Sequence, residues 1–276
     1  MSTPTLTTAP EVGRHGPFTL AVSSEMVFGE LTVAQRLRHL HELGFQVEIW
    51  DWSNHDLDVL AAAVADGVVI GSMTGYLRGT LADPDGAAEL LATARDSIDV
   101  AKRLGIPRLN LHGTGLDGDG LPVVPCDDVT GPMWARAALT LEAVARLGQE
   151  HDVVFELENL NRGVDHPRTP FATAADTLGL VQTVDSPYLR LNLDLYHAQV
   201  DEGNLIELCR RALPYVGEIQ VADVPGRCEP GTGEINYPAI ARALADAGYT
   251  GTIAMEAKAA GDSTDAVEAF RAAFTL

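Results

Sequence analysis

The stretch between residues 153 and 256 contains four apolar, strand-like runs: VVFELE (153–158), LRLNLD (189–194), VGEIQ (216–220) and GTIAME (251–256). Each run is followed by loop residues and then by a segment with helical periodicity. Strands that alternate with helices in this way favour a parallel sheet, because a parallel neighbour can be reached only through a crossover connection. The stretch therefore predicts repeated strand–helix units.

The sequence before this stretch repeats the same pattern, with strand-like runs at FTLAV (18–22), FQVEIW (45–50), GVVIGSM (67–73) and RLNLH (108–112). The helices are expected near residues 33–43, 56–66, 85–104, 134–150, 171–184, 201–213, 237–247 and 263–274. No G-x-G-x-x-G turn follows the first strand, which disfavours an open dinucleotide-binding sheet. The eight units predict an α/β fold, a single (β/α)₈ TIM barrel over residues 17–276, behind a flexible tail at 1–16.

Composition narrows the function classes. The chain has 276 residues, a formal net charge of −20 and 46% hydrophobic residues. An acidic surface disfavours nucleic acid and anionic membranes as partners. The three cysteines are far apart and form no C-x-x-C pair, which is typical of a reducing compartment. No apolar run approaches the length of a membrane helix, so we expect a cytoplasmic protein, with homo-oligomerisation left open.

Polar side chains close the four runs of the opening stretch: Glu158, Asp194, Gln220 and Glu256. In a parallel barrel all C-terminal strand ends open onto one face, where TIM-barrel active sites lie. Carboxylate and carboxamide oxygens that converge there suit a hard divalent cation, Mg²⁺ or Mn²⁺. A buried amide such as Gln220 costs a few kcal/mol without a partner, and either a metal or a neighbouring strand could supply one.

Five further residues are expected to line the pocket or contact substrate: Glu48, Arg78, His112, His197 and Arg227. His197 follows Asp194 by one helical turn. Arg227 lies on the Gly/Pro-rich loop 222–238, where it could anchor a substrate carboxylate or pair with Glu229 to stiffen the loop. The long loop after the fourth strand, up to Pro132, is of the kind that often forms a lid.

Three segments are recognisable: ELENLN (156–161), DLYHAQVDEGNL (194–205) and IQVADVPGRCEPGTGEINYP (219–238). They resemble the hydroxypyruvate isomerase family of xylose isomerase-like TIM barrels. The resemblance implies that the four strand-end residues bind a divalent ion. It also implies that Glu158 and Glu256 form an acid/base pair and that His197 and Arg227 touch substrate. The implied reaction converts hydroxypyruvate to tartronate semialdehyde through a cis-enediolate.

Rival functions remain open. Ketose or keto-acid 3-epimerases resemble this arrangement, but their third ligand is His, so Gln220 favours the isomerase. A phosphodiesterase similar to the AP endonucleases would need a basic surface and a rich His/Asp/Glu zinc cluster, which a charge of −20 and eight His do not favour. A non-catalytic sugar-acid-binding subunit is the third alternative. The loops SMTGYLRG (72–79) and LHGTGLDGDG (111–120) depart from the family pattern and bear on substrate identity.

Overall fold

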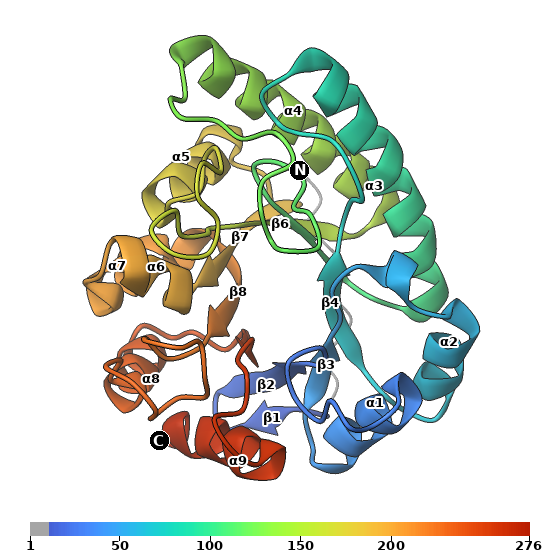
Figure 1. Cartoon of the computed structure of the whole chain (residues 1–276), viewed down its shortest axis with the longest axis vertical. Helices are drawn as coiled ribbons and strands as arrows, with labels where there is room; N and C mark the ends of the chain where they lie inside the picture. Colours follow the sequence, from blue (N-terminus) through green and yellow to red (C-terminus); the bar gives the residue numbers. More distant parts are fainter. Residues whose placement is uncertain (1–10) are drawn as a thin grey trace.

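Parallel strands close into a barrel in the computed structural model, which describes residues 11–276 (Figure 1). The strands run in chain order and the first pairs with the last, so the sheet has no open edge among them. They are β2 (Phe18–Ser23), β3 (Gln46–Glu48), β4 (Ile70–Thr74), β5 (Arg108–Leu111), β6 (Val154–Glu158), β7 (Leu189–Asp194), β8 (Val216–Val221) and β9 (Thr252–Met255). The prediction of a (β/α)₈ TIM barrel is confirmed.

The chain enters the barrel through a short antiparallel pairing. Strand β1 (Arg14–His15) pairs with the start of β2, with Arg14 opposite Thr19. The tail predicted for residues 1–16 therefore includes this short strand, and its first ten residues lie outside the described part of the chain.

Helices surround the barrel on its outer side (Figure 1). They are α1 (Val33–Glu42), α2 (Leu57–Ala65), α3 (Pro84–Leu104), α4 (Gly131–His151), α5 (Ala174–Val184), α6 (Leu195–Asp201), α7 (Leu205–Ala212), α8 (Tyr237–Asp246) and α9 (Ser263–Ala273), with short 3₁₀ turns η1 (Trp52–Asn54) and η2 (Leu213–Tyr215). Within the described residues, no helix is both long and apolar enough to cross a bilayer. The three cysteines are free.

Local signals explain most of the helix boundaries. Thr32 caps α1 in a capping box with Gln35, and Gly105 ends α3 in a left-handed conformation with φ 70°. The helix predicted at 201–213 is α7, which begins at Leu205, and the sequence did not predict α6, which precedes it. Helix α6 begins directly after β7, because the Asp194 side chain accepts a hydrogen bond from the His197 backbone N–H at 2.9 Å. The residue that ends the strand therefore also starts the helix.

The barrel interior contains a polar layer below its mouth. Arg108 donates from Nε to Glu218 at 2.9 Å and lies 3.8 Å from Glu156. Both glutamates are buried, as is Glu48 at the end of β3. Burial raises the pKa of Glu156 and of Glu48, and the nearby Glu218 raises both further. The Arg108 guanidinium and several carboxylates therefore share a largely buried space.

Candidate active site

The four strand-end residues lie at one end of the barrel. Glu158 and Asp194 are the last residues of β6 and β7, Gln220 is next to last in β8, and Glu256 directly follows β9. Asp194 is also in register with Gln220 across the β7–β8 pair. All four side chains are buried. The C-terminal mouth of the barrel therefore carries the acidic centre, at the face where active sites of this fold are found.

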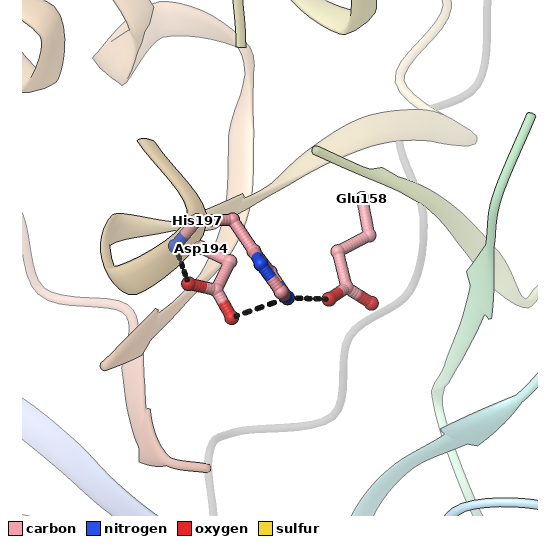
Figure 2. A group of neighbouring side chains, drawn as sticks. All are labelled: Glu158, Asp194 and His197. Atoms are coloured by element: carbon pink, nitrogen blue, oxygen red, sulfur yellow. Dashed lines mark hydrogen bonds and ion pairs between the residues drawn. The ribbon is translucent and has the colours of Figure 1, made fainter. Parts of the chain in front are cut away.

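Two of these residues form a tight group with a histidine (Figure 2). Glu158, Asp194 and His197 each offer an atom that could ligate a metal, and these atoms lie within 4.8 Å of one another. His197 Nε2 lies 3.8 Å from Asp194 Oδ2 and 4.0 Å from Glu158 Oε1, so the ring stands between the two carboxylates. Judged by spacing, this group could hold a metal ion.

Glu158 is held by residues of β5 and of the loop that follows it. Its Oε2 accepts a hydrogen bond from Asn110 Nδ2 and lies 3.1 Å from His112 Nε2. The other ring nitrogen of His112 lies 3.1 Å from the hydroxyl of Tyr76, which donates to the Thr114 carbonyl at 2.7 Å. Burial alone would raise the pKa of Glu158, but the hydrogen bonds from His112 and Asn110 outweigh it and lower that pKa. His112 therefore faces the site.

Glu256 is held by two loops instead. Its Oε1 accepts from Trp50 Nε1 at 2.7 Å, and its Oε2 accepts from Arg227 Nη2 at 2.8 Å. The guanidinium of Arg227 also lies over the ring of Tyr196, 5.1 Å from its centroid. Burial raises the pKa of Glu256 to about 7, although the Arg227 charge and the Trp50 hydrogen bond act in the opposite direction. The alternative pairing of Arg227 with Glu229 is not formed, since Glu229 accepts from the Ala260 backbone N–H.

Gln220 has protein partners for both ends of its amide. Its Oε1 accepts from Asn192 Nδ2 at 2.7 Å, and its Nε2 donates to Glu48 Oε2 at 3.2 Å. Glu48 in turn accepts from Ser72 Oγ at 2.9 Å and is 2% exposed. The neighbouring-strand partner expected as one alternative for Gln220 is therefore present, and Glu48 lies beneath the mouth rather than at its opening.

Arg78 does not join this group. Its side chain is 66% exposed and its Nε pairs with Glu89 of α3 at 2.9 Å. The loop after β5 lies beside the mouth instead, because the Gly120 carbonyl is 2.6 Å from His166 Nδ1 and Cys126 N donates to the Arg168 carbonyl at 2.7 Å. These contacts join it to the loop that follows β6.

Sequence reasoning did not single out Trp50, Asn110, Asn161 or His166. Trp50 ends the strand-like run 45–50, and the indole N–H group that it places at a strand end was an available signal. Asn110 lies two residues before His112 and shares its face of the strand. His166 lies in a loop with no local pattern. Its ring packs 5.1 Å from that of His197, a contact that no sequence spacing indicates.

The fold and this acidic centre together define a barrel with its candidate active site at the C-terminal mouth. Residues 35–274 match the family described as xylose isomerase-like TIM barrel, and the chain belongs to that family. The family resemblance predicted from the sequence is confirmed.

Curated relatives are named as isomerases. A human protein named "Putative hydroxypyruvate isomerase" is 30% identical over 92% of this chain and 95% of its own length. The Escherichia coli hydroxypyruvate isomerase is 26% identical over 84% of this chain and 90% of its own. A 2-oxo-tetronate isomerase of Pectobacterium atrosepticum is 36% identical over 42% of this chain and 44% of its own. These relatives confirm the prediction of an isomerase.

Solved structures share the fold. An AP endonuclease of family 2 from Brucella melitensis has a TM-score of 0.77 and 24% identity, covering 90% of this chain and 96% of its own. An L-ribulose 3-epimerase has a TM-score of 0.72 and 22% identity over 92% of each chain. An IolI protein solved with a zinc atom has a TM-score of 0.73 and 16% identity, covering 92% and 95%. At these identities the likeness shows the architecture alone.

Proposed function

We propose that this protein is a metal-assisted isomerase of small hydroxy-keto acids, with hydroxypyruvate as substrate and tartronate semialdehyde as product. The observation that carries the proposal is the buried group of Glu158, Asp194 and His197, with the Glu256–Arg227 pair at the same mouth. The names of relatives that span most of the chain support the same class. Cytoplasmic location belongs to this proposal and rests on cysteine usage.

The carboxylates of the mouth fit a divalent cation. Burial raises the pKa of Asp194, Arg227 lowers it, and the negative charges of Glu158 and Glu256 raise it further. Acidic oxygens crowded in this way repel one another, and a cation would offset that repulsion. Glu158, Asp194, Gln220 and Glu256 would hold the ion, and their oxygen donors favour Mg²⁺ or Mn²⁺. When bound, it would supply Lewis-acid polarisation of the substrate carbonyl.

The two glutamates would move the proton. One carboxylate takes a proton from C3 of hydroxypyruvate, which gives a cis-enediolate. A proton is then returned to C2 while the proton of the C3 hydroxyl moves to the oxygen on C2, so that C3 becomes the aldehyde of tartronate semialdehyde. Glu158 is held by Asn110 of β5 and by His112 directly after it, whereas Glu256 is held by residues of two other loops, so different segments position the two carboxylates. Their pKa values also move in opposite directions. A pair of groups with separated pKa values suits acid/base chemistry.

Arg227 would bind the substrate carboxylate. Its Nη2 is occupied by Glu256, while its buried Nε has no hydrogen-bond partner among the described residues. A guanidinium held by one acid and stacked on a ring still has donors left for a second carboxylate. This arrangement favours an acidic substrate over a neutral sugar.

A ketose or keto-acid 3-epimerase is the second candidate, because two glutamates beside one enediolate also permit epimerisation. Purified protein should be assayed with hydroxypyruvate and with neutral ketoses, after chelation and after reloading with Mg²⁺ or Mn²⁺. We expect isomerisation of hydroxypyruvate that is lost on chelation and restored by metal. Faster turnover of a ketose would favour the epimerase. No turnover of either substrate would favour the non-catalytic alternative.

A further inference from the structure

The orientation of one buried amide is determined by its surroundings. Asn161 lies after β6 in the loop beside the mouth, and it is fully buried. Its Oδ1 accepts from the backbone N–H groups of Val164 at 3.0 Å and Asp165 at 2.8 Å. The reversed amide would point its own N–H groups at these two donors. The NH₂ group must therefore lie on the other side.

The NH₂ group of Asn161 faces two acceptors there. One is Asp165 Oδ2 at 2.6 Å, and the other is His197 Nδ1 at 2.7 Å. Both N–H bonds of the amide are used, one for each. Because an N–H group points at His197 Nδ1, that nitrogen carries no proton. The ring proton of His197 is therefore on Nε2.

The Nε2–H group of His197 points into the candidate active site. The side chain is completely buried, and Nε2 has no hydrogen-bond partner among the described residues. Its nearest acidic atoms, on Asp194 and Glu158, lie at 3.8 and 4.0 Å, beyond hydrogen-bond distance. A buried donor without a partner is costly, and an oxygen of a bound molecule would satisfy it.

We propose that Asn161, together with Asp165, is a positioning residue that fixes His197 as an Nε2–H donor to a substrate oxygen and excludes it from metal coordination. The substrate part of this inference rests on the proposed function. The tautomer part rests on hydrogen bonds alone.

This arrangement is the reverse of a metal-ligand histidine. A ligating nitrogen needs its lone pair, and the other ring nitrogen then donates its N–H to a carboxylate or a carbonyl. Here the other nitrogen, Nδ1, meets a donor. The spacing of Glu158, Asp194 and His197 would suit an ion, but the protonation of the ring leaves only the two carboxylates of this group as ligands.

The tautomer can be measured without any turnover. The full chain labelled with ¹⁵N-histidine should give long-range ¹H–¹⁵N correlations for its eight His, and His197→Gln identifies the His197 signals by their loss. We expect an unprotonated Nδ1 and a protonated Nε2, unchanged when Mg²⁺ or Zn²⁺ is added alone. A proton on Nδ1, or loss of the Nε2 proton on adding either metal, would overturn the proposal.

A double variant reverses the polarity of the contact. Asn161→Asp with Asp165→Asn keeps the shapes and the net charge of the pair, yet places a carboxylate oxygen opposite His197 Nδ1. The ring proton should move to Nδ1, and kcat/KM should fall by about 10²- to 10³-fold, the typical effect of losing one preorganised donor. A double variant that retains the Nε2 proton, or that reverses the tautomer with undiminished turnover, contradicts the proposal.

Asp201→Asn is the matched control. Asp201 holds the same loop by accepting from the backbone N–H groups of Arg162 at 2.7 Å and Gly163 at 3.1 Å, but it does not contact His197. This variant should loosen the loop and leave the tautomer unchanged. If the wild type has the expected tautomer but does not isomerise hydroxypyruvate, the proposed function fails and the tautomer assignment stands.

Discussion

Two acidic layers lie inside the same barrel, and each contains one arginine. In the lower layer Arg108 pairs with Glu218 at 2.9 Å, and in the upper layer Arg227 pairs with Glu256 at 2.8 Å. The layers use the same strands, since Glu156 and Glu158 are two residues apart on β6. Side chains two residues apart on a strand share a face, so both layers point into the barrel and lie two residues apart along each strand.

The layers differ in what supports them. The lower layer comes from strand residues, and Arg108 itself belongs to β5. The upper layer combines strand ends with loop residues, including Trp50 and Arg227, and Trp50 is 42% exposed. Residue type alone therefore does not identify an active site. The position of an acid along its strand decides whether it lies inside the barrel among strand residues or at the C-terminal mouth among loop residues.

The largest expected difference between the layers is catalytic. Glu256→Gln should lower kcat by at least about 10²- to 10⁴-fold, the range for loss of a general acid or base, and should keep the melting temperature close to that of the wild type. Glu158→Gln should behave in the same way. Glu156→Gln is the control from the lower layer and should retain turnover. Near-normal kcat in Glu256→Gln would remove Glu256 from the mechanism.

The two arginines should also differ in their effect on substrate binding. Arg227→Ala should raise KM for hydroxypyruvate by roughly 10- to 100-fold, the effect of losing a charged hydrogen bond, and should raise KM for a neutral ketose much less. Steady-state kinetics with both substrates measure this difference. Equal increases for the two would show that Arg227 has a structural role, like Arg108.

The upper layer should titrate near neutral pH. The pKa of Glu256 is raised to about 7, and its carboxylate accepts from the indole N–H of Trp50. In metal-free protein, we expect tryptophan emission to change between about pH 6 and 8, as the carboxylate forms and strengthens this hydrogen bond. Glu256→Gln should abolish the change, while Glu156→Gln should keep it. A transition that persists in Glu256→Gln would belong to another group.

The smallest effect concerns stability. Burial raises the pKa of Glu156 in the folded chain well above its ordinary value of 4.5. As pH rises above about 4.5 the unfolded chain releases this proton first, so the free energy of unfolding falls as pH rises toward the folded-state pKa. Glu156→Gln removes this loss, so at pH 8 the free energy of unfolding should rise by about 0.5–2 kcal/mol and the melting temperature should rise with it. The gain should vanish near pH 4.

Glu218→Gln is the matched variant for this stability prediction. Glu218 is the direct partner of Arg108, so its replacement leaves a buried guanidinium with a weaker partner. We expect this variant to melt below the wild type at both pH values. If Glu156→Gln also melts lower at pH 8, Glu156 is a stabilising partner of Arg108 and the account of the lower layer is wrong.

The amino-acid sequence by itself determined the barrel and the face on which its polar strand ends lie. Periodicity and cap residues act over a few positions, so they identify each strand and helix locally. Parallel strands then align their C-terminal ends without further information. Glu158, Asp194, Gln220 and Glu256 could be placed at one mouth for that reason.

Only the tertiary structure decided which side chains meet there. Trp50 and Glu256 are 206 residues apart, and Gln220 and Glu48 are 172 apart, so no local pattern couples them. The ring proton of His197 depends on the amide orientation of Asn161, which in turn depends on two backbone N–H groups of a loop. Such contacts follow from loop conformations and side-chain rotamers that exist only once the barrel has closed, because closure brings distant strand ends within hydrogen-bond distance.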